Sequence, residues 1–106
     1  MKNYKLIANE SYDMIGEEID LQIRLNPRAR EIKFIKVDGM QLMYDAYVLQ
    51  GTDIPAIQNA NFVDTRPRRE LGNIINGELS EGPLPKEVRV ICPNRVRDSW
   101  GIFFKR

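Results

Sequence analysis

The chain has 106 residues, 42% of them hydrophobic, so residues 1–106 are long enough for one domain and too short for two. The net charge is only +1, but all ten Arg and four of the six Lys are concentrated in three basic segments, 21–37, 66–69 and 86–106, which alternate with acidic ones. With no His and one Cys, the chain cannot build an intrachain disulfide, an ordinary zinc site, or a Ser–His–Asp or Cys–His catalytic group.

The first part of the chain predicts two strands. Residues 4–8 favour an edge strand, and residues 9–16 favour a short helical turn. Apolar and polar residues alternate over 17–25, a period of two that indicates a strand with one buried face. Residues 26–29 then predict a turn, because Pro27 fixes φ at the first central position.

The middle of the chain predicts a hairpin. Residues 31–37 favour a strand, and a second apolar run follows at 41–49. Between them stands Asp38-Gly39, a residue pair that favours the tight turns of hairpins. Residues 50–61 contain Gly, Pro and Asn and are predicted to be a loop.

The last part predicts a short strand at 61–65, a helix over 66–79 and a final hairpin. Gly77 is a candidate C-cap that would shorten the helix. Residues 88–92 and 100–105 are rich in β-branched and aromatic residues, which favour strands.

These elements amount to five to seven strands with one or two short helices, and no repeat is evident. A sustained strand–helix–strand rhythm is absent, which argues against a parallel α/β fold. The sequence therefore predicts a mainly β fold, with α+β as a variant: a small antiparallel sandwich or partly open barrel carrying one or two short helices.

The sequence also indicates where the protein acts. No apolar run is long enough to span a membrane, and the start lacks the apolar stretch of a signal peptide. We therefore expect a cytoplasmic protein without a membrane partner. Domains of this size often gain stability by association, so we expect a homo-oligomer. Cys92 follows two apolar residues and is predicted to be a buried, unreactive thiol.

The missing chemistry argues against catalysis. No Gly-rich phosphate-binding motif of the Walker or Rossmann type occurs, and the commonest general base is absent. We therefore expect a protein that is not an enzyme and that uses no metal ion and no cofactor.

Arginine-rich segments are the candidate binding groups. The planar guanidinium group grips phosphate in two places, and a helix start adds further attraction for anions. Exposed rings beside arginines could stack on a base. Each segment could instead form surface ion pairs, and Trp100 could instead belong to the core. The candidate ligand-binding residues are Arg24, Arg28, Arg30, Arg66, Arg68, Arg69, Phe62, Asn94, Arg95, Arg97 and Trp100.

Three binding functions fit this pattern. A long polyanion usually demands a clear positive excess, so the nearly neutral chain favours a compact phosphate-bearing nucleotide. One alternative is a protein–protein inhibitor or immunity module whose charged segments match a partner. The other is a single-stranded nucleic-acid-binding β-barrel.

The short length, the strand-rich pattern and the Arg-bearing segments Asn26–Arg30 and Thr65–Arg69 resemble a phage anti-Thoeris sponge family. The resemblance concerns the whole chain and not a specific motif. It implies a viral, oligomeric protein in the host cytoplasm that sequesters cyclic ADP-ribose-type or cyclic oligonucleotide immune signals without cleaving them, and so inhibits anti-phage defence. It also implies that Arg24, Arg28, Arg66, Arg68 and Arg69 contact phosphate and that Phe62 or Trp100 stacks on a base.

Overall fold

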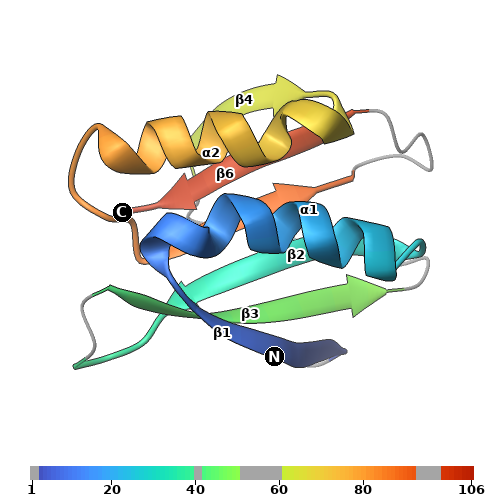
Figure 1. Ribbon diagram of the computed structural model, residues 1–106, viewed down its shortest axis with the longest axis horizontal. Helices are drawn as coiled ribbons and strands as arrows, with labels where there is room; N and C mark the ends of the chain where they lie inside the picture. The colour runs from blue at the N-terminus through green and yellow to red at the C-terminus, as the bar shows by residue number, and fades with distance from the viewer. Residues whose placement is uncertain (1–2, 40–41, 51–60, 93–98) are drawn as a thin grey trace.

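A computed structural model describes residues 3–39, 42–50, 61–92 and 99–106. One antiparallel sheet holds six strands in the order β1-β3-β2-β5-β6-β4, and two helices lie side by side on one of its faces (Figure 1). The mainly antiparallel class with two short helices is confirmed; the sheet is open, and the helices form the second layer. The elements are β1 (Tyr4–Ser11), α1 (Ile15–Leu25), β2 (Ala29–Lys36), β3 (Met43–Gln50), β4 (Asn61–Arg66), α2 (Leu71–Ser80), β5 (Glu87–Ile91) and β6 (Trp100–Lys105), with single 3₁₀ turns at Tyr12–Met14 and Arg68–Glu70 before the helices.

The fold consists of two similar halves. Each half runs strand, 3₁₀ turn, helix, strand, strand, and the sheet order reads the same from either edge when the halves are exchanged. Equivalent residues share one spacing of 56 positions, as from Gly16 to Gly72. The expectation of no repeat was wrong. The repeat is hard to recognise in the sequence, because few residues are identical between the halves and what they share is mainly apolar character, as in Tyr44 and Trp100, both fully buried.

Residues 17–25, predicted as a strand, belong to helix α1. Ile15, Ile19 and Ile23 recur every four residues and are buried, as a helix facing the sheet requires. The intervening apolar residues that created the alternation are exposed, Leu21 at 37% and Leu25 at 62%. The period of two was therefore a by-product of two exposed leucines on a helix.

The other predicted elements are close to the observed ones. The β2–β3 hairpin forms, and Gly39 adopts a φ of +76°, the left-handed conformation that glycine tolerates. The short strand, the helix and the final antiparallel strand pair appear as β4, α2 and β5–β6. Helix α2 continues through Gly77 to Ser80, so Gly77 is not its C-cap. Most of the predicted loop at 50–61 lies outside the described residues.

The core lies between the helices and the sheet. Its strand residues alternate along β2, β3, β5 and β6 and include Phe34, Val90 and Trp100, all fully buried. Cys92 is buried among them as expected. Neither described helix has the length and apolar character needed to span a membrane.

The opposite face of the sheet contains a buried ion pair. The Arg89 side chain donates to both carboxylate oxygens of Glu31, at 2.5 and 2.9 Å, and the two side chains are 4% and 0% exposed. The Tyr4 hydroxyl donates to the same carboxylate. Burial, and then the neighbouring Glu31, raise the pKa of Tyr4 well above its ordinary value. The network joins β1, β2 and β5, so it links the two halves across the sheet.

The two helices meet at their first turns. A Cβ atom added to Gly16 would lie 2.5 Å from the carbonyl oxygen of Gly72, and one added to Gly72 would lie 2.8 Å from that of Gly16. Only glycine permits this approach. It holds the start of α2 beside α1, and this position creates the candidate site.

Candidate anion-binding pocket

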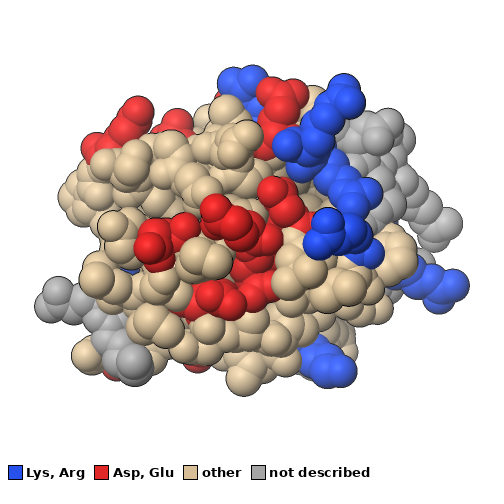
Figure 2. Space-filling view, viewed as in Figure 1, with Lys and Arg blue, Asp and Glu red and all other residues tan. Residues whose placement is uncertain are grey.

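A hollow of about 740 Å³ lies where α1 meets the turn that precedes α2. Its lining residues are Asp20 and Arg24 from α1, and Pro67, Arg68 and Arg69 from the 3₁₀ turn. Figure 2 shows basic side chains gathered on one side of the helical face, next to a group of acidic side chains. Two of the three Arg segments predicted from the sequence therefore contribute to one cavity.

The backbone explains this convergence. Arg24 follows Asp20 by four residues, so the two side chains project from the same side of α1 one turn apart. Strand β4 ends at Arg66, and Pro67 is followed at once by the 3₁₀ turn that carries Arg68 and Arg69. The contact between Gly16 and Gly72 holds this turn beside α1.

Asp20 is tied to the start of α2. Its carboxylate accepts the backbone N–H of Gly72, one of the first-turn amides that lack a partner within the helix. Burial raises the pKa of Asp20 above its ordinary value, against the opposing effects of the Gly72 N–H, Arg68 and Arg24. The carboxylate therefore already occupies part of the helix start that was expected to attract an external anion.

The three pocket arginines are exposed and carry their charge into the cavity. Within the described part of the chain, no ion pair joins Arg24, Arg68 or Arg69 to a carboxylate. The guanidinium groups and Asp20 face one hollow without forming a salt bridge. The hydrogen-bonding capacity of the three guanidinium groups is thus open to a ligand.

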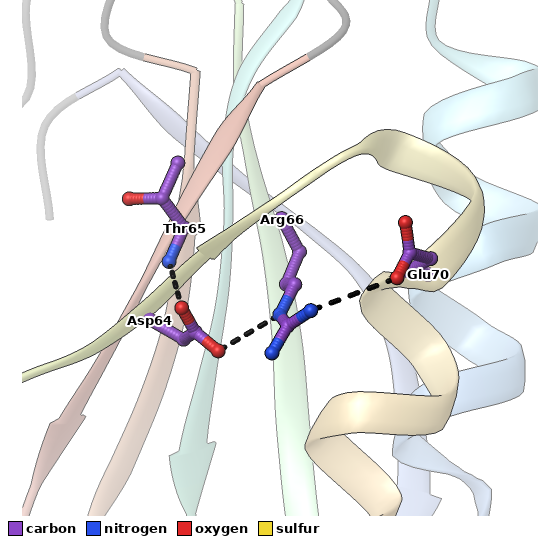
Figure 3. Close-up of polar contacts among 4 residues, drawn as sticks. All are labelled: Asp64, Thr65, Arg66 and Glu70. Atoms are coloured by element: carbon purple, nitrogen blue, oxygen red, sulfur yellow. Dashed lines mark hydrogen bonds and ion pairs between the residues drawn. The ribbon is translucent and has the colours of Figure 1, made fainter.

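Arg66 behaves differently from its neighbours (Figure 3). Its Nε donates to Asp64 at 2.8 Å, and its Nη1 lies 3.7 Å from Glu70. The Arg66 hydrogen bond, then the Thr65 N–H, hold the pKa of Asp64 below its ordinary value. Two carboxylates thus engage Arg66, which links the end of β4 to the start of α2 and does not line the pocket.

The remaining predicted residues lie elsewhere. Arg28 is exposed in the turn after α1, and Arg30 is buried in β2. Phe62 is 60% exposed on β4, where its ring meets Phe103 edge-on at 5.6 Å between centroids. Trp100 is fully buried in the core, so its ring is not available for stacking on a ligand. The predicted residues Asn94, Arg95 and Arg97 lie outside the described part of the chain.

Asp20 is the pocket residue that sequence reasoning missed. On the strand first expected for 17–25, Asp20 and Arg24 would be separated by four residues of extended chain, about 13 Å. On a helix the same spacing makes them neighbours. Recognising the stripe formed by Ile15, Ile19 and Ile23 would have identified the helix and hence the pair.

The internal repeat offers a comparison for the pocket, which lies between the two halves. The positions equivalent to Arg24, Arg68 and Arg69 are held by Ser80, Tyr12 and Asp13. The two halves nevertheless fold alike, so the architecture does not require arginine at these places. The basic pocket, which takes Asp20 and Arg24 from the first half and Arg68 and Arg69 from the second, therefore has no basic counterpart at the positions that the repeat relates to it.

A second hollow, of about 430 Å³, lies at the far end of the central strands. Lys36, Lys86 and Lys105 line it together with Asp38 and Glu87. Two acids offset the lysines there, and lysine lacks the bidentate geometry of arginine. In the segments that the structure describes, no group of three or more acidic or cysteine side chains is placed to hold a metal ion.

Comparisons of the chain with protein-family models, curated proteins and solved structures found no match.

Proposed function

We propose that the chain is a non-enzymatic binding protein that holds a phosphate-bearing nucleotide in the pocket of Arg24, Arg68 and Arg69. One observation carries the proposal: guanidinium groups from two segments far apart in sequence line one cavity without a salt bridge to any described carboxylate. Exposed arginines in such a cavity supply bidentate, charge-assisted hydrogen bonds to phosphate oxygens.

The size of the pocket and its surroundings favour a compact ligand. A volume of about 740 Å³ lies within the usual range for small-molecule sites. Acidic side chains stand beside the basic group on the helical face (Figure 2), and they would repel a polyanion that extended past the pocket. Cyclic nucleotide immune signals, which the resemblance to the sponge family implies, belong to this compact class.

Binding without conversion is the second part of the proposal. The chain has no His to act as a general base, and Asp20 is the one acid among the described residues that line the pocket. That carboxylate is engaged by the Gly72 N–H. Sequestration requires affinity and no chemical step, so this set of residues is sufficient for it.

A protein partner is the second candidate, favoured by exposed apolar side chains. Leu6 and Phe62 are 56% and 60% exposed, on the two edge strands β1 and β4. Edge strands also offer unpaired backbone groups to another chain, including a second copy of this protein. Measuring the molecular mass by light scattering, with and without Phe62→Ser, tests whether this edge joins subunits.

Calorimetry tests the nucleotide proposal directly. The panel comprises cyclic dinucleotides, cyclic trinucleotides and cyclic ADP-ribose isomers, titrated into protein at about 50 µM, a concentration at which sequestering affinities saturate. We expect one class to bind and the double variant Arg68→Ala/Arg69→Ala to lose at least tenfold in affinity, since each charge-assisted bond contributes roughly 1.5–3 kcal/mol.

Arg28→Ala is the matched control, because it removes an exposed arginine that does not line the pocket. It should bind like the wild type. Absence of heat with every member of the panel, or equal losses in the control and the double variant, would contradict the proposal.

A further inference from the structure

Asp20 distinguishes this pocket from a simple anion site. A pocket built only for phosphate gains nothing from a carboxylate, which repels the ligand. Yet Asp20 lines the cavity together with Arg24 and Arg68, near enough for both charges to lower its pKa. The presence of an acid among the arginines requires an explanation.

The fold does not require that negative charge. Asp20 accepts the N–H of Gly72, and the equivalent residue of the other half, Asn76, accepts the N–H of Gly16 at 3.1 Å. The two hydrogen bonds are related by the internal repeat. Because an amide oxygen fulfils this structural role in one half, the charge in the other half is free to serve the ligand.

The carboxylate also has unused capacity. An ionised carboxylate has about four acceptor positions, and the Gly72 N–H occupies one. In the described residues no salt bridge joins Asp20 to an arginine. Asp20 is therefore able to accept hydrogen bonds from hydroxyl groups of a molecule held in the same hollow by its phosphates.

We propose that Asp20 reads the ribose of the bound nucleotide: Arg24, Arg68 and Arg69 hold phosphate, and the Asp20 carboxylate accepts hydrogen bonds from ribose hydroxyls. The inference rests on the proposed function and adds a specificity to it. The ligand class becomes ribonucleotides, in preference to deoxyribose analogues and to free phosphate or pyrophosphate.

The variant Asp20→Asn tests this with little risk to the fold, because it gives α1 the residue type that α2 has at Asn76. The probes are ADP, 2′,3′-dideoxy-ADP and inorganic pyrophosphate, titrated into wild type and variant. Wild type should prefer ADP to the dideoxy compound by about tenfold, the size expected for a hydrogen bond to a charged acceptor.

In the variant this preference should shrink to about twofold or less, while pyrophosphate binds more tightly because a repelling charge is gone. A merely structural role for Asp20 would weaken the binding of all three probes together. Binding of pyrophosphate by the wild type with equal affinity for the two nucleotides, or a preference that Asp20→Asn leaves intact, would overturn the inference and leave the anion pocket standing. No binding of any probe would overturn both.

Discussion

Asp20 on α1 and Asn76 on α2 hold the starts of each other's helices. Asp20 accepts the backbone N–H of Gly72, and Asn76 accepts that of Gly16. Each bond satisfies an amide that has no partner within its own helix. The two hydrogen bonds are equivalent in geometry, but only Asp20 carries a charge, and Asp20 lines the arginine pocket. Asp20 therefore both holds the start of α2 and supplies the proposed specificity for ribose.

The helix contact predicts a sharp sensitivity to small side chains. In Gly16→Ala the new Cβ would lie 2.5 Å from the Gly72 carbonyl oxygen and from the Asn76 side chain. We expect a loss of about 1–3 kcal/mol in the free energy of unfolding, the usual cost of overpacking, as measured by urea denaturation.

Gly77→Ala is the matched control on α2, since nothing lies within 4 Å of its added Cβ. It should stabilise the protein by roughly 0.5–1 kcal/mol through helix propensity. Equal effects of the two substitutions would show that the helices do not meet as closely as described.

The Glu31–Arg89 pair predicts a strong dependence on both partners. Arg89→Met would leave the Glu31 carboxylate buried without its cation, and the expected loss is about 3–5 kcal/mol in the free energy of unfolding. Arg66→Met provides the comparison, because its partner Asp64 is 37% exposed and such pairs contribute at most about 1 kcal/mol. A loss at Arg89 no larger than at Arg66 would contradict the burial of the first pair.

The proximity of Glu10 to Glu18 makes the free energy of unfolding depend on pH. A hydrogen bond with Glu18, then burial and the charge of Glu18, raise the pKa of Glu10 above its ordinary value in the folded protein. A raised folded pKa means that the contribution to stability is present below the unfolded pKa and is lost as the pH rises through the folded one. Glu10→Gln should therefore be more stable than wild type at pH 7, and the difference should shrink towards pH 4.

Urea denaturation of both proteins at several pH values measures this difference. Glu81→Gln neutralises an exposed carboxylate at the end of α2 and controls for the change in net charge. If Glu10→Gln gains no more than the control at pH 7, the two carboxyl groups do not influence each other.

Local signals predicted the strands and turns well. The Asp38-Gly39 pair indicated a hairpin, which forms between β2 and β3, and Gly39 has a positive φ. Helix α1 was missed because the exposed Leu21 and Leu25 produce the alternation that is typical of a strand. Only Ile15, together with the later isoleucines of the buried stripe, distinguishes the helix from a strand. Periodicity misleads where a helix exposes apolar residues beside its buried stripe.

The pocket was predictable only in part. The sequence indicated that arginine segments matter, but whether they meet depends on how α1 packs against α2. That packing rests on Gly16 and Gly72, two small residues that carry no obvious signal. The pairing of Arg66 with Asp64 and Glu70 likewise separates it from Arg68, although both stand in one basic segment. Long-range contacts decided which arginines remain open.

The central claim is that nucleotide phosphate binds among Arg24, Arg68 and Arg69, and a nuclear magnetic resonance titration with ADP tests it most directly. The Nε–H signals of these arginines and the Gly72 amide should shift together with one affinity. The Gly16 amide, which the repeat places at the equivalent position, and the Arg66 Nε–H should stay unchanged. Shifts centred on Lys36, Lys86 and Lys105, or no shifts at all, would contradict the claim.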